Sequence, residues 1–252
     1  MRILSRVFKR KTIINEPTVY SDDTFLVSYP KSGNTWARFI VANLLKKSDD
    51  QIDFHSAVDY VPEIGVHHEI AEALDRPRIL KSHQVYNPSF QRVVYLIRDP
   101  RDVYVSYYHY LRKKLPSNLA FSQFLKEKVD TPSSWKAHVH SWQDKSNVVA
   151  TFRYEDLLAN THEEVSRLAS VLGIVADENK IREAIEASSF SSMKTIEQKN
   201  GRPFTNESDK ATATDFVRKG QQGDWVNYFS QEDLAYLSQN TKDLASRFGY
   251  QL

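Results

Sequence analysis

The chain has 252 residues, of which 40% are hydrophobic and 26% charged, and it contains no cysteine. These proportions are ordinary for a globular protein, and the length suits one sizeable α/β domain or two small ones. The lack of cysteine excludes disulfide scaffolds, thiolate metal sites and cysteine nucleophiles. The formal net charge of +2 gives no support to a nucleic-acid-binding protein held by a global positive field.

The N-terminal segment, residues 1–20, is basic but lacks the continuous apolar stretch of a secretory signal. Two interpretations stay open for it: a frayed terminus, or a short amphipathic segment that touches an anionic membrane surface. No apolar run in the sequence approaches the roughly 20 residues needed to cross a bilayer. We therefore expect a cytoplasmic protein without a transmembrane segment.

Four runs rich in β-branched and aromatic residues predict strands at residues 24–30, 77–83, 92–100 and 147–157. Between them, one helix is predicted at 33–46, and a second begins with Asp99 as N-cap and Pro100 in the first turn. A third helical pattern ends at Gly173, a C-cap. The alternation indicates a single domain over residues 1–252, an α/β fold whose mostly parallel central sheet is flanked by helices. Ligands of such sheets bind at the carboxyl ends of the strands.

The turn after the first predicted strand reads YPKSGNTW, residues 29–36. The ammonium of Lys31, the hydroxyls of Ser32 and Thr35, and the N–H groups that open the next helix would together bind a phosphate-like anion. The turn does not match the ATP-binding pattern G-x-x-x-x-G-K-[ST]. Ordinary capping explains the turn equally well, with Ser32 capping the helix and Lys31 in water.

The segment LKSH, residues 80–83, places Lys81 and His83 on one face of a predicted strand, because side chains alternate along a strand. A histidine is the usual general base near neutral pH, although a lone histidine is more often structural. The other histidines do not form a metal site, since His138 and His140 have the wrong spacing to share a helix face and no HExxH pattern occurs. We expect no metal cofactor.

The third predicted strand ends at Arg98, in IRDPRDVYVSYYHY at residues 97–110. A guanidinium suits bidentate binding of a phosphate, and Ser106 in the following helix could offer a hydroxyl to the same group. An ion pair between Arg98 and an aspartate, closing the end of the strand, is equally consistent with the pattern.

Two polar segments lie near the C-terminus. Residues 195–216 lack sustained periodicity, which indicates either a lid or simple disorder. In VRKGQQGDW, residues 217–225, two adjacent cations precede a glycine-containing turn that can approach an anion closely. Taken alone, this turn is better explained as an exposed charged loop.

Together and in this order, YPKSGNTW, LKSH, RDPRDVYVSYY and RKGQQGDW resemble the motifs of the PAPS-dependent sulfotransferases, and they span residues 29–225. The donor of that family is 3′-phosphoadenosine 5′-phosphosulfate (PAPS), and its nucleotide product is 3′,5′-bisphosphoadenosine (PAP). The resemblance implies a P-loop-like three-layer fold and in-line transfer of a sulfuryl group to an acceptor hydroxyl, with a histidine base and no metal. The alternatives are a P-loop-like small-molecule kinase and a non-catalytic nucleotide-binding module.

The resemblance also implies a role for each matching residue. Lys31 would contact the bridging oxygen and the 5′-phosphate, and His83 would be the catalytic base with Lys81 as its electrostatic neighbour. The implied nucleotide-binding set comprises Lys31, Ser32, Gly33, Asn34 and Thr35 at the 5′-phosphate, Arg98, Ser106, Arg218, Lys219 and Gly220 at the 3′-phosphate, and Trp36, Tyr154, Ser188 and Phe190 at the adenine.

The sequence departs from the family pattern in two places. Asn34 replaces a common threonine, although an amide still donates a hydrogen bond. The dimer motif K-x-x-x-T-V-x-x-x-E is missing from residues 226–235, which read VNYFSQEDLA, so the oligomeric state stays open. The acceptor also stays open: a small-molecule, sugar or lipid hydroxyl is expected, with residues 51–76 lining its side of the site.

Overall fold

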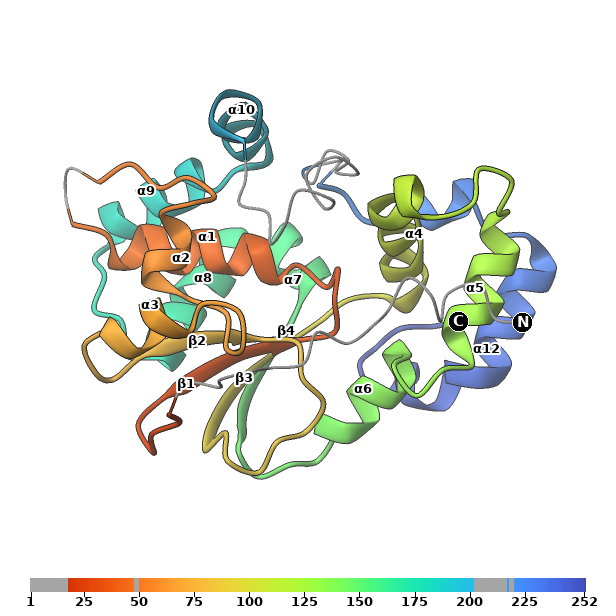
Figure 1. The fold of residues 1–252 in the computed structure, drawn as a ribbon, viewed down its shortest axis with the longest axis horizontal. Coiled ribbons are helices and arrows are strands. Elements are labelled where there is room, and N and C mark those ends of the chain that lie inside the picture. The colour runs from red at the N-terminus through yellow and green to blue at the C-terminus, as the bar shows by residue number, and fades with distance from the viewer. Residues whose placement is uncertain (1–17, 48–49, 202–216, 218–219) are drawn as a thin grey trace.

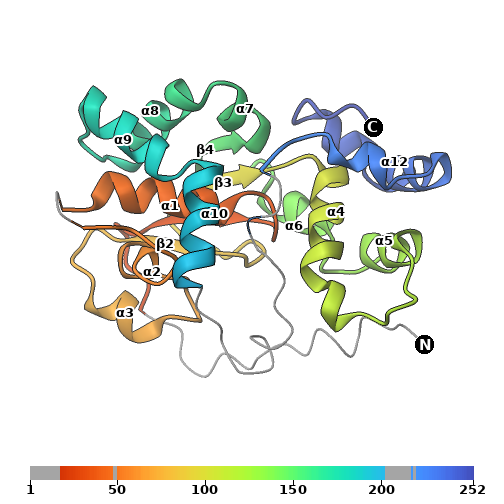
Figure 2. The same cartoon turned by 90° about the horizontal axis from the view of Figure 1, so that it is seen from above.

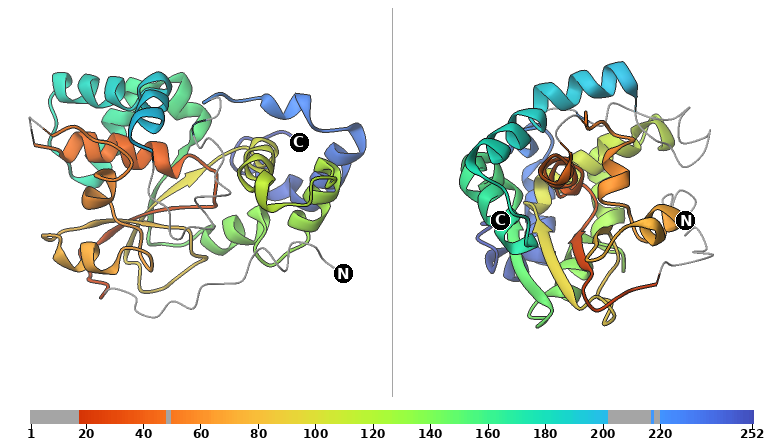
Figure 3. Two further views of the ribbon diagram at one scale, coloured as in Figure 1. Left: turned by 45° about the horizontal axis from the view of Figure 1, so that its top comes forward. Right: turned by 90° about the vertical axis from the view of Figure 1, so that its left-hand side faces the viewer.

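The structure is a computed structural model that describes residues 18–47, 50–201, 217 and 220–252. Its centre is a sheet of four parallel strands in the order β2–β1–β3–β4. The strands are β1 (Thr24–Ser28), β2 (Ile79–Ser82), β3 (Arg92–Ile97) and β4 (Val148–Arg153). Figure 3 shows them side by side, with helices above their carboxyl ends.

The helices form two groups on opposite sides of the sheet (Figures 1 and 2). The first group is built around α1 (Asn34–Leu45), α7 (Tyr154–Ala159), α8 (Thr161–Leu172) and α9 (Glu178–Ala187), with α2 (Ala57–Tyr60), α3 (His68–Ala73) and α10 (Phe190–Asn200) beside it. The second group contains α4 (Pro100–Leu111), α5 (Phe121–Val129), α6 (Trp135–Trp142) and α12 (Gln231–Ser246), with the 3₁₀ turns η2 (Arg112–Lys114) and η3 (Asp224–Asn227).

Strand β1 shows how the sequence produces this layering. All five of its residues are buried, and successive side chains point to opposite faces. Leu26 therefore packs in the core of the first helix group, while Phe25 and Val27 pack in the core of the second. The sequence of a strand that is buried on both faces is a continuous apolar run, without the alternation of a half-exposed strand. The predicted α/β fold with a parallel sheet between two helical layers is confirmed.

The predicted elements are correct in kind and too long at their carboxyl ends. The run at 92–100 stops as a strand at Ile97, because Asp99 caps α4 and Pro100 occupies its first turn. Gly173 ends α8 in the left-handed conformation, as predicted. The prediction of a structureless segment over 195–216 is wrong at its start, since Thr195–Asn200 continue α10. Its remainder after Gly201, like the basic N-terminal segment up to residue 17, lies outside the described residues.

None of the helices in the described part of the chain is both long and apolar enough to cross a membrane.

Candidate active site

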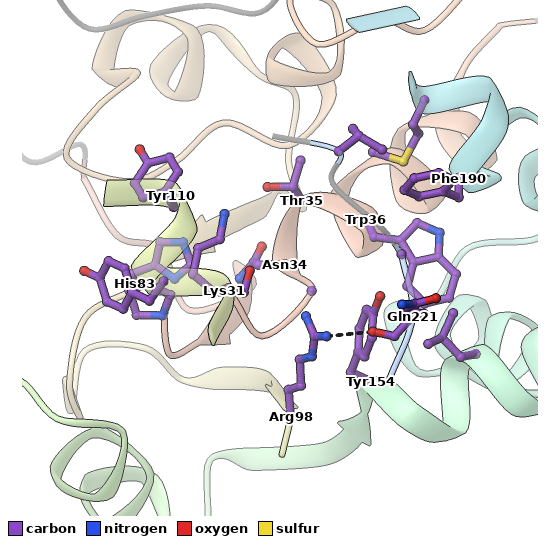
Figure 4. A pocket seen from close by; sticks show the side chains of 18 of the residues that line it. Lys31, Asn34, Thr35, Trp36, His83, Arg98, Tyr110, Tyr154, Phe190 and Gln221 are labelled. Carbon is purple, nitrogen blue, oxygen red and sulfur yellow. Dashed lines mark hydrogen bonds between the residues drawn. The ribbon is translucent and has the colours of Figure 1, made fainter. Parts of the chain in front are cut away.

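A cavity of about 440 Å³ opens at the carboxyl ends of β1, β2 and β3, between the two helix groups (Figure 4). It brings together residues from all four motifs. Twelve of the predicted site residues line it: Lys31, Gly33, Asn34, Thr35, Trp36, Lys81, His83, Arg98, Ser106, Tyr154, Phe190 and Gly220. Ser32 and Ser188 do not line it, and Arg218 and Lys219 lie outside the described residues.

The turn before α1 has the geometry of an anion site. Gly33 is the N-cap, with φ 93°, and no side chain caps the helix, so the prediction of an ordinary cap by Ser32 is wrong. Among the described residues, no side chain accepts a hydrogen bond from the N–H groups of the first helical turn. Lys31 also has a left-handed backbone, with φ 71°, which is strained for a residue with a side chain. Its ammonium lies 4.4 Å from the centre of the Tyr110 ring.

Two polar side chains of this turn face inward. Ser32 is 1% exposed, and its hydroxyl has no hydrogen-bond partner among the described residues. The Asn34 amide donates to the carbonyl oxygen of Leu26 at 3.1 Å and to the hydroxyl of Ser28 at 3.1 Å. The side-chain donor of Asn34 is thus already used within the protein. Only its backbone N–H, at the helix N-terminus, stays available to an anion.

Aromatic side chains line the end of the cavity nearest α10. Trp36 and Tyr154 meet edge to face, with ring centres 5.6 Å apart, and Phe190 lies beside them (Figure 4). The Trp36 indole N–H donates to the carbonyl oxygen of Ser188 at 2.9 Å. Ser188, which is fully buried, therefore fixes Trp36 from behind instead of touching a ligand. This end is a slot for a flat apolar ring.

Arg98 stands below this slot, with its guanidinium 4.2 Å from the centre of the Tyr154 ring. It donates to the carbonyl oxygen of Gln221 at 3.0 Å, the hydrogen bond drawn in Figure 4, and it lies 3.8 Å from the Asp102 carboxylate. Its Nε has no hydrogen-bond partner among the described residues. The predicted ion pair of Arg98 with an aspartate does form, and it leaves part of the guanidinium for a ligand.

Asp102 supports the wall of the cavity, although the sequence analysis did not single it out. Its carboxylate accepts hydrogen bonds from the backbone N–H groups of Gly223, at 2.7 Å, and Trp225, at 3.0 Å. Arg101 stacks on the Trp225 ring at 4.1 Å. These contacts join the RDPRD motif to the GDW motif, and they place Gly220 at the cavity. The sequence shows the repeated Arg-Asp pairs of RDPRD, but the N–H groups that bind Asp102 lie more than a hundred residues further along the chain.

His83 lies at the opposite end of the cavity from the aromatic slot (Figure 4). Its Nδ1 is 2.7 Å from the carbonyl oxygen of Ser28. A carbonyl can only accept, so Nδ1 carries the proton and Nε2 carries the lone pair. Burial and, next, the charge of Lys81 lower the pKa of His83 to about 3. The imidazole is therefore neutral at pH 7 and holds one defined tautomer.

Lys81 forms an ion pair with Glu63, with the ammonium and carboxylate 2.6 Å apart. Burial lowers the pKa of Lys81, and the charge of Glu63 opposes that effect. Burial alone would raise the pKa of Glu63, but the charge and hydrogen bond of Lys81 outweigh it and hold the pKa at about 2. The Glu63 carboxylate is therefore ionised at pH 7. Glu63, inside the segment 51–76 expected on the acceptor side, is the second site residue that no motif had singled out.

The lining residues given by the structure include three cations, Lys31, Lys81 and Arg98, against one carboxylate, Glu63. The cavity therefore favours an anionic ligand, with a flat ring at one end and a neutral imidazole at the other. No cluster of histidine, aspartate and glutamate suited to a metal ion occurs within the described ranges.

Comparison with known proteins agrees with this arrangement. Residues 21–249 match the model of the sulfotransferase domain family. The chain is 33% identical over 231 residues to the 3-beta-hydroxysteroid sulfotransferase of Cavia porcellus, covering 84% of this chain and 79% of the relative. It is 31% identical over 233 residues to sulfotransferase 1E1 of Bos taurus, covering 83% of this chain and 78% of the relative.

Solved structures show the same likeness. The mouse sulfotransferase SULT7A1 complexed with PAP has a TM-score of 0.70 and 25% identity, over 91% of this chain and 85% of the other. Retinol dehydratase in a complex with retinol and PAP shares the fold, with a TM-score of 0.70 and 22% identity, over 90% of this chain and 82% of the other. A kinase is therefore not the right interpretation. The chain belongs to the family that its motifs resemble, the PAPS-dependent sulfotransferases.

Proposed function

We propose that the cavity binds PAPS with its adenine in the slot formed by Trp36, Tyr154 and Phe190. Two glycines support this placement, because any side chain there would fill the space beside those rings. A Cβ on Gly33 would lie 2.6 Å from the Tyr154 ring, and a Cβ on Gly220 would lie 2.3 Å from the Phe190 ring. The backbone thus approaches the slot as closely as it can, which only glycine permits.

The two phosphates are assigned to two different elements. Lys31 and the N–H groups that begin α1 would hold the 5′-phosphosulfate, because a helix N-terminus with a lysine favours an anion. Arg98 and Ser106 would hold the 3′-phosphate, together with Gly220 and with Arg218 and Lys219, which lie outside the described residues. Arg98 and Ser106 both line the cavity, which supports this assignment.

His83 is the general base of the proposed reaction, and the observation that carries this role is its hydrogen bond to Ser28. The carbonyl of Ser28, 2.7 Å from Nδ1, leaves the lone pair on Nε2, which can take the proton of an acceptor hydroxyl. In the cavity as described, the pKa of His83 is about 3. Negative charge brought into the cavity by the donor opposes the effect of Lys81 and raises that pKa toward the range of an effective base.

PAPS supplies the sulfuryl group, which moves in line to the acceptor oxygen. While this happens, the protein has two tasks. Nε2 of His83 accepts the hydroxyl proton, so the attacking oxygen becomes more nucleophilic. Lys31 and the N-terminus of α1 stabilise the charge that develops on the departing phosphate oxygen, and they are fixed before the reaction begins. Lys81 adds positive charge at the sulfuryl side, and the rest of the rate comes from positioning.

The acceptor is a hydroxyl compound that reaches His83 from the end of the cavity lined by Glu63, Tyr107 and Tyr110. The names of two relatives indicate hydroxysteroids and retinol, but small-molecule, sugar and lipid hydroxyls all remain within the proposal. A cytoplasmic location is also part of the proposal, and the lack of cysteine is compatible with a reducing compartment. For the basic N-terminal segment, a frayed terminus and contact with an anionic membrane surface are the two alternatives.

The proposal is tested by a screen of hydroxyl acceptors with PAPS labelled in its sulfuryl group. The native chain is run beside His83→Ala and Lys31→Ala, with PAP affinity measured for each by calorimetry. Transfer to one acceptor class that is lost in both variants supports the assigned roles. Undiminished transfer in His83→Ala would show that another group takes the proton.

A further inference from the structure

Glu63 is held at the acceptor end of the cavity by its backbone. Residues 62–64 run parallel to β2 beyond its edge, with Lys81 N–H donating to Pro62 at 2.8 Å and Ile64 N–H donating to Lys81 at 2.9 Å. The Glu63 N–H donates to Nδ1 of His67 at 3.0 Å. These bonds fix Glu63 directly beside Lys81, so the ion pair between the two side chains forms on a rigid frame.

The ion pair with Lys81 uses only one of the two oxygens of the Glu63 carboxylate. Oε2 accepts the hydrogen bond from Lys81 at 2.6 Å, whereas no described residue donates to Oε1. The side chain is 22% exposed and lines the cavity, and Oε1 is not among the enclosed atoms that lack a partner. A carboxylate oxygen therefore faces the cavity and accepts no hydrogen bond within the described part of the protein.

The same holds for His83, a second hydrogen-bond acceptor at this end. Its Nδ1 is committed to Ser28, and Nε2 has no partner within the described ranges. The two residues lie on either side of Lys81, with His83 two positions along the chain from it and Glu63 next to it across the strand pairing. Nε2 and Oε1 are thus two separate acceptors that this end of the cavity presents to a ligand.

We propose that Glu63 selects acceptors that carry a second hydrogen-bond donor beside the reacting hydroxyl, as in a vicinal diol of a sugar ring. The reacting hydroxyl donates to Nε2 of His83, and the neighbouring hydroxyl donates to Oε1 of Glu63. This inference rests on the proposed function, because it uses His83 as the base.

The enzyme discriminates between substrates because covering the charged Glu63 carboxylate without giving it a hydrogen-bond donor is costly. A hydrogen bond to a charged group contributes about 1.5–3 kcal/mol, which corresponds to about 10- to 150-fold in kcat/KM. An acceptor with a single hydroxyl and an apolar body would cover Oε1 without donating to it. A site that hydrogen-bonds a substrate hydroxyl strongly rejects the analogue without that hydroxyl. An apolar pocket rejects a substrate with an added group only weakly.

The test compares cyclohexanol with its vicinal diol as acceptors of labelled sulfuryl, using the native chain, Glu63→Gln and Glu69→Gln. Glu69 is an exposed glutamate of α3 that does not line the cavity, so it is a control for the same chemical change. We expect the native chain and Glu69→Gln to prefer the diol by at least tenfold in kcat/KM. Glu63→Gln should lose most of that preference through a higher KM for the diol.

Two results would overturn the inference: no preference for the diol in the native chain, or an equal loss with both alcohols in Glu63→Gln. The second would mean that Glu63 acts only by holding Lys81. If neither alcohol is turned over, calorimetric binding of each alcohol to the enzyme–PAP complex replaces kcat/KM and is judged in the same way. Failure of the proposed function itself looks different, because the enzyme would then bind no PAP and transfer no label to any hydroxyl.

Discussion

Replacing Gly33 by alanine tests the link between the turn before α1 and the nucleotide slot. Gly33 has φ 93°, and a Cβ there would lie 2.6 Å from Cδ2 of Tyr154. The left-handed backbone costs about 1–2 kcal/mol for a residue with a side chain. Forcing the Tyr154 ring aside adds the cost of overpacking, about 1–3 kcal/mol. The free energy of unfolding should therefore fall by about 2–5 kcal/mol.

The ring cannot move without disturbing the ligand contacts. Tyr154 lies 4.2 Å from the Arg98 guanidinium and 5.6 Å from the Trp36 ring. Its displacement would disturb both the adenine slot and the residue assigned to the 3′-phosphate. We expect PAP to bind at least tenfold more weakly, a loss of about 1.4 kcal/mol or more.

Gly173→Ala is the matched control. Gly173 also has a left-handed backbone, with φ 71°, but nothing lies within 4 Å of its added Cβ. It should lose only the backbone cost of about 1–2 kcal/mol and keep native PAP affinity. Urea unfolding and calorimetry with PAP are measured on both variants. Equal destabilisation of the two, or native PAP affinity in Gly33→Ala, would refute the reasoning.

Three further predictions follow from the site and the buried histidines. His83→Gln should lower kcat by about 10²- to 10⁴-fold at unchanged PAP affinity, because only the base is removed; a loss confined to PAP affinity would contradict the role. The pKa of His83 is lowered to about 3, and those of His67 and His138 to about 4, chiefly by burial. Below about pH 6.5 the unfolded chain therefore binds more protons than the folded chain, so the free energy of unfolding should fall as the pH drops from 7 to 5. Urea unfolding should show a less steep fall for His83→Gln than for the native chain. Asp102→Ala should weaken PAP binding at least tenfold by releasing the GDW segment, whereas Asp177→Ala, which removes the remote N-cap of α9, should leave PAP binding unchanged.

Local chemistry made much of the fold predictable. Asp99 and Pro100 start α4 where a cap followed by proline predicts a helix, and Gly173 ends α8 in the conformation that glycine adopts readily. The apolar run of β1 indicated a strand buried on both faces, which Phe25 and Leu26 confirm by packing in different cores. Because the carboxyl ends of parallel strands meet at one edge, the position of the site also followed.

The details of the site depended on contacts that are distant in sequence. Glu63 reaches Lys81 through backbone pairing at the edge of β2, and no short-range pattern predicts which residue that pairing selects. Asp102 binds backbone N–H groups, which carry no sequence signal. The Asn34 amide donates hydrogen bonds, as expected, but it donates them to β1. A buried amide without an acceptor would be costly, and the bond to the Leu26 carbonyl oxygen avoids that cost.

The most direct test of the central claim, that this cavity is the PAPS site, is calorimetric titration with PAP and with ADP. The native chain and Arg98→Ala are compared. If Arg98 holds the 3′-phosphate, the native chain should prefer PAP by about 10- to 150-fold, the worth of a charged hydrogen bond, and Arg98→Ala should lose that preference. Equal affinity of the native chain for both nucleotides, or an unchanged preference in Arg98→Ala, would contradict the account.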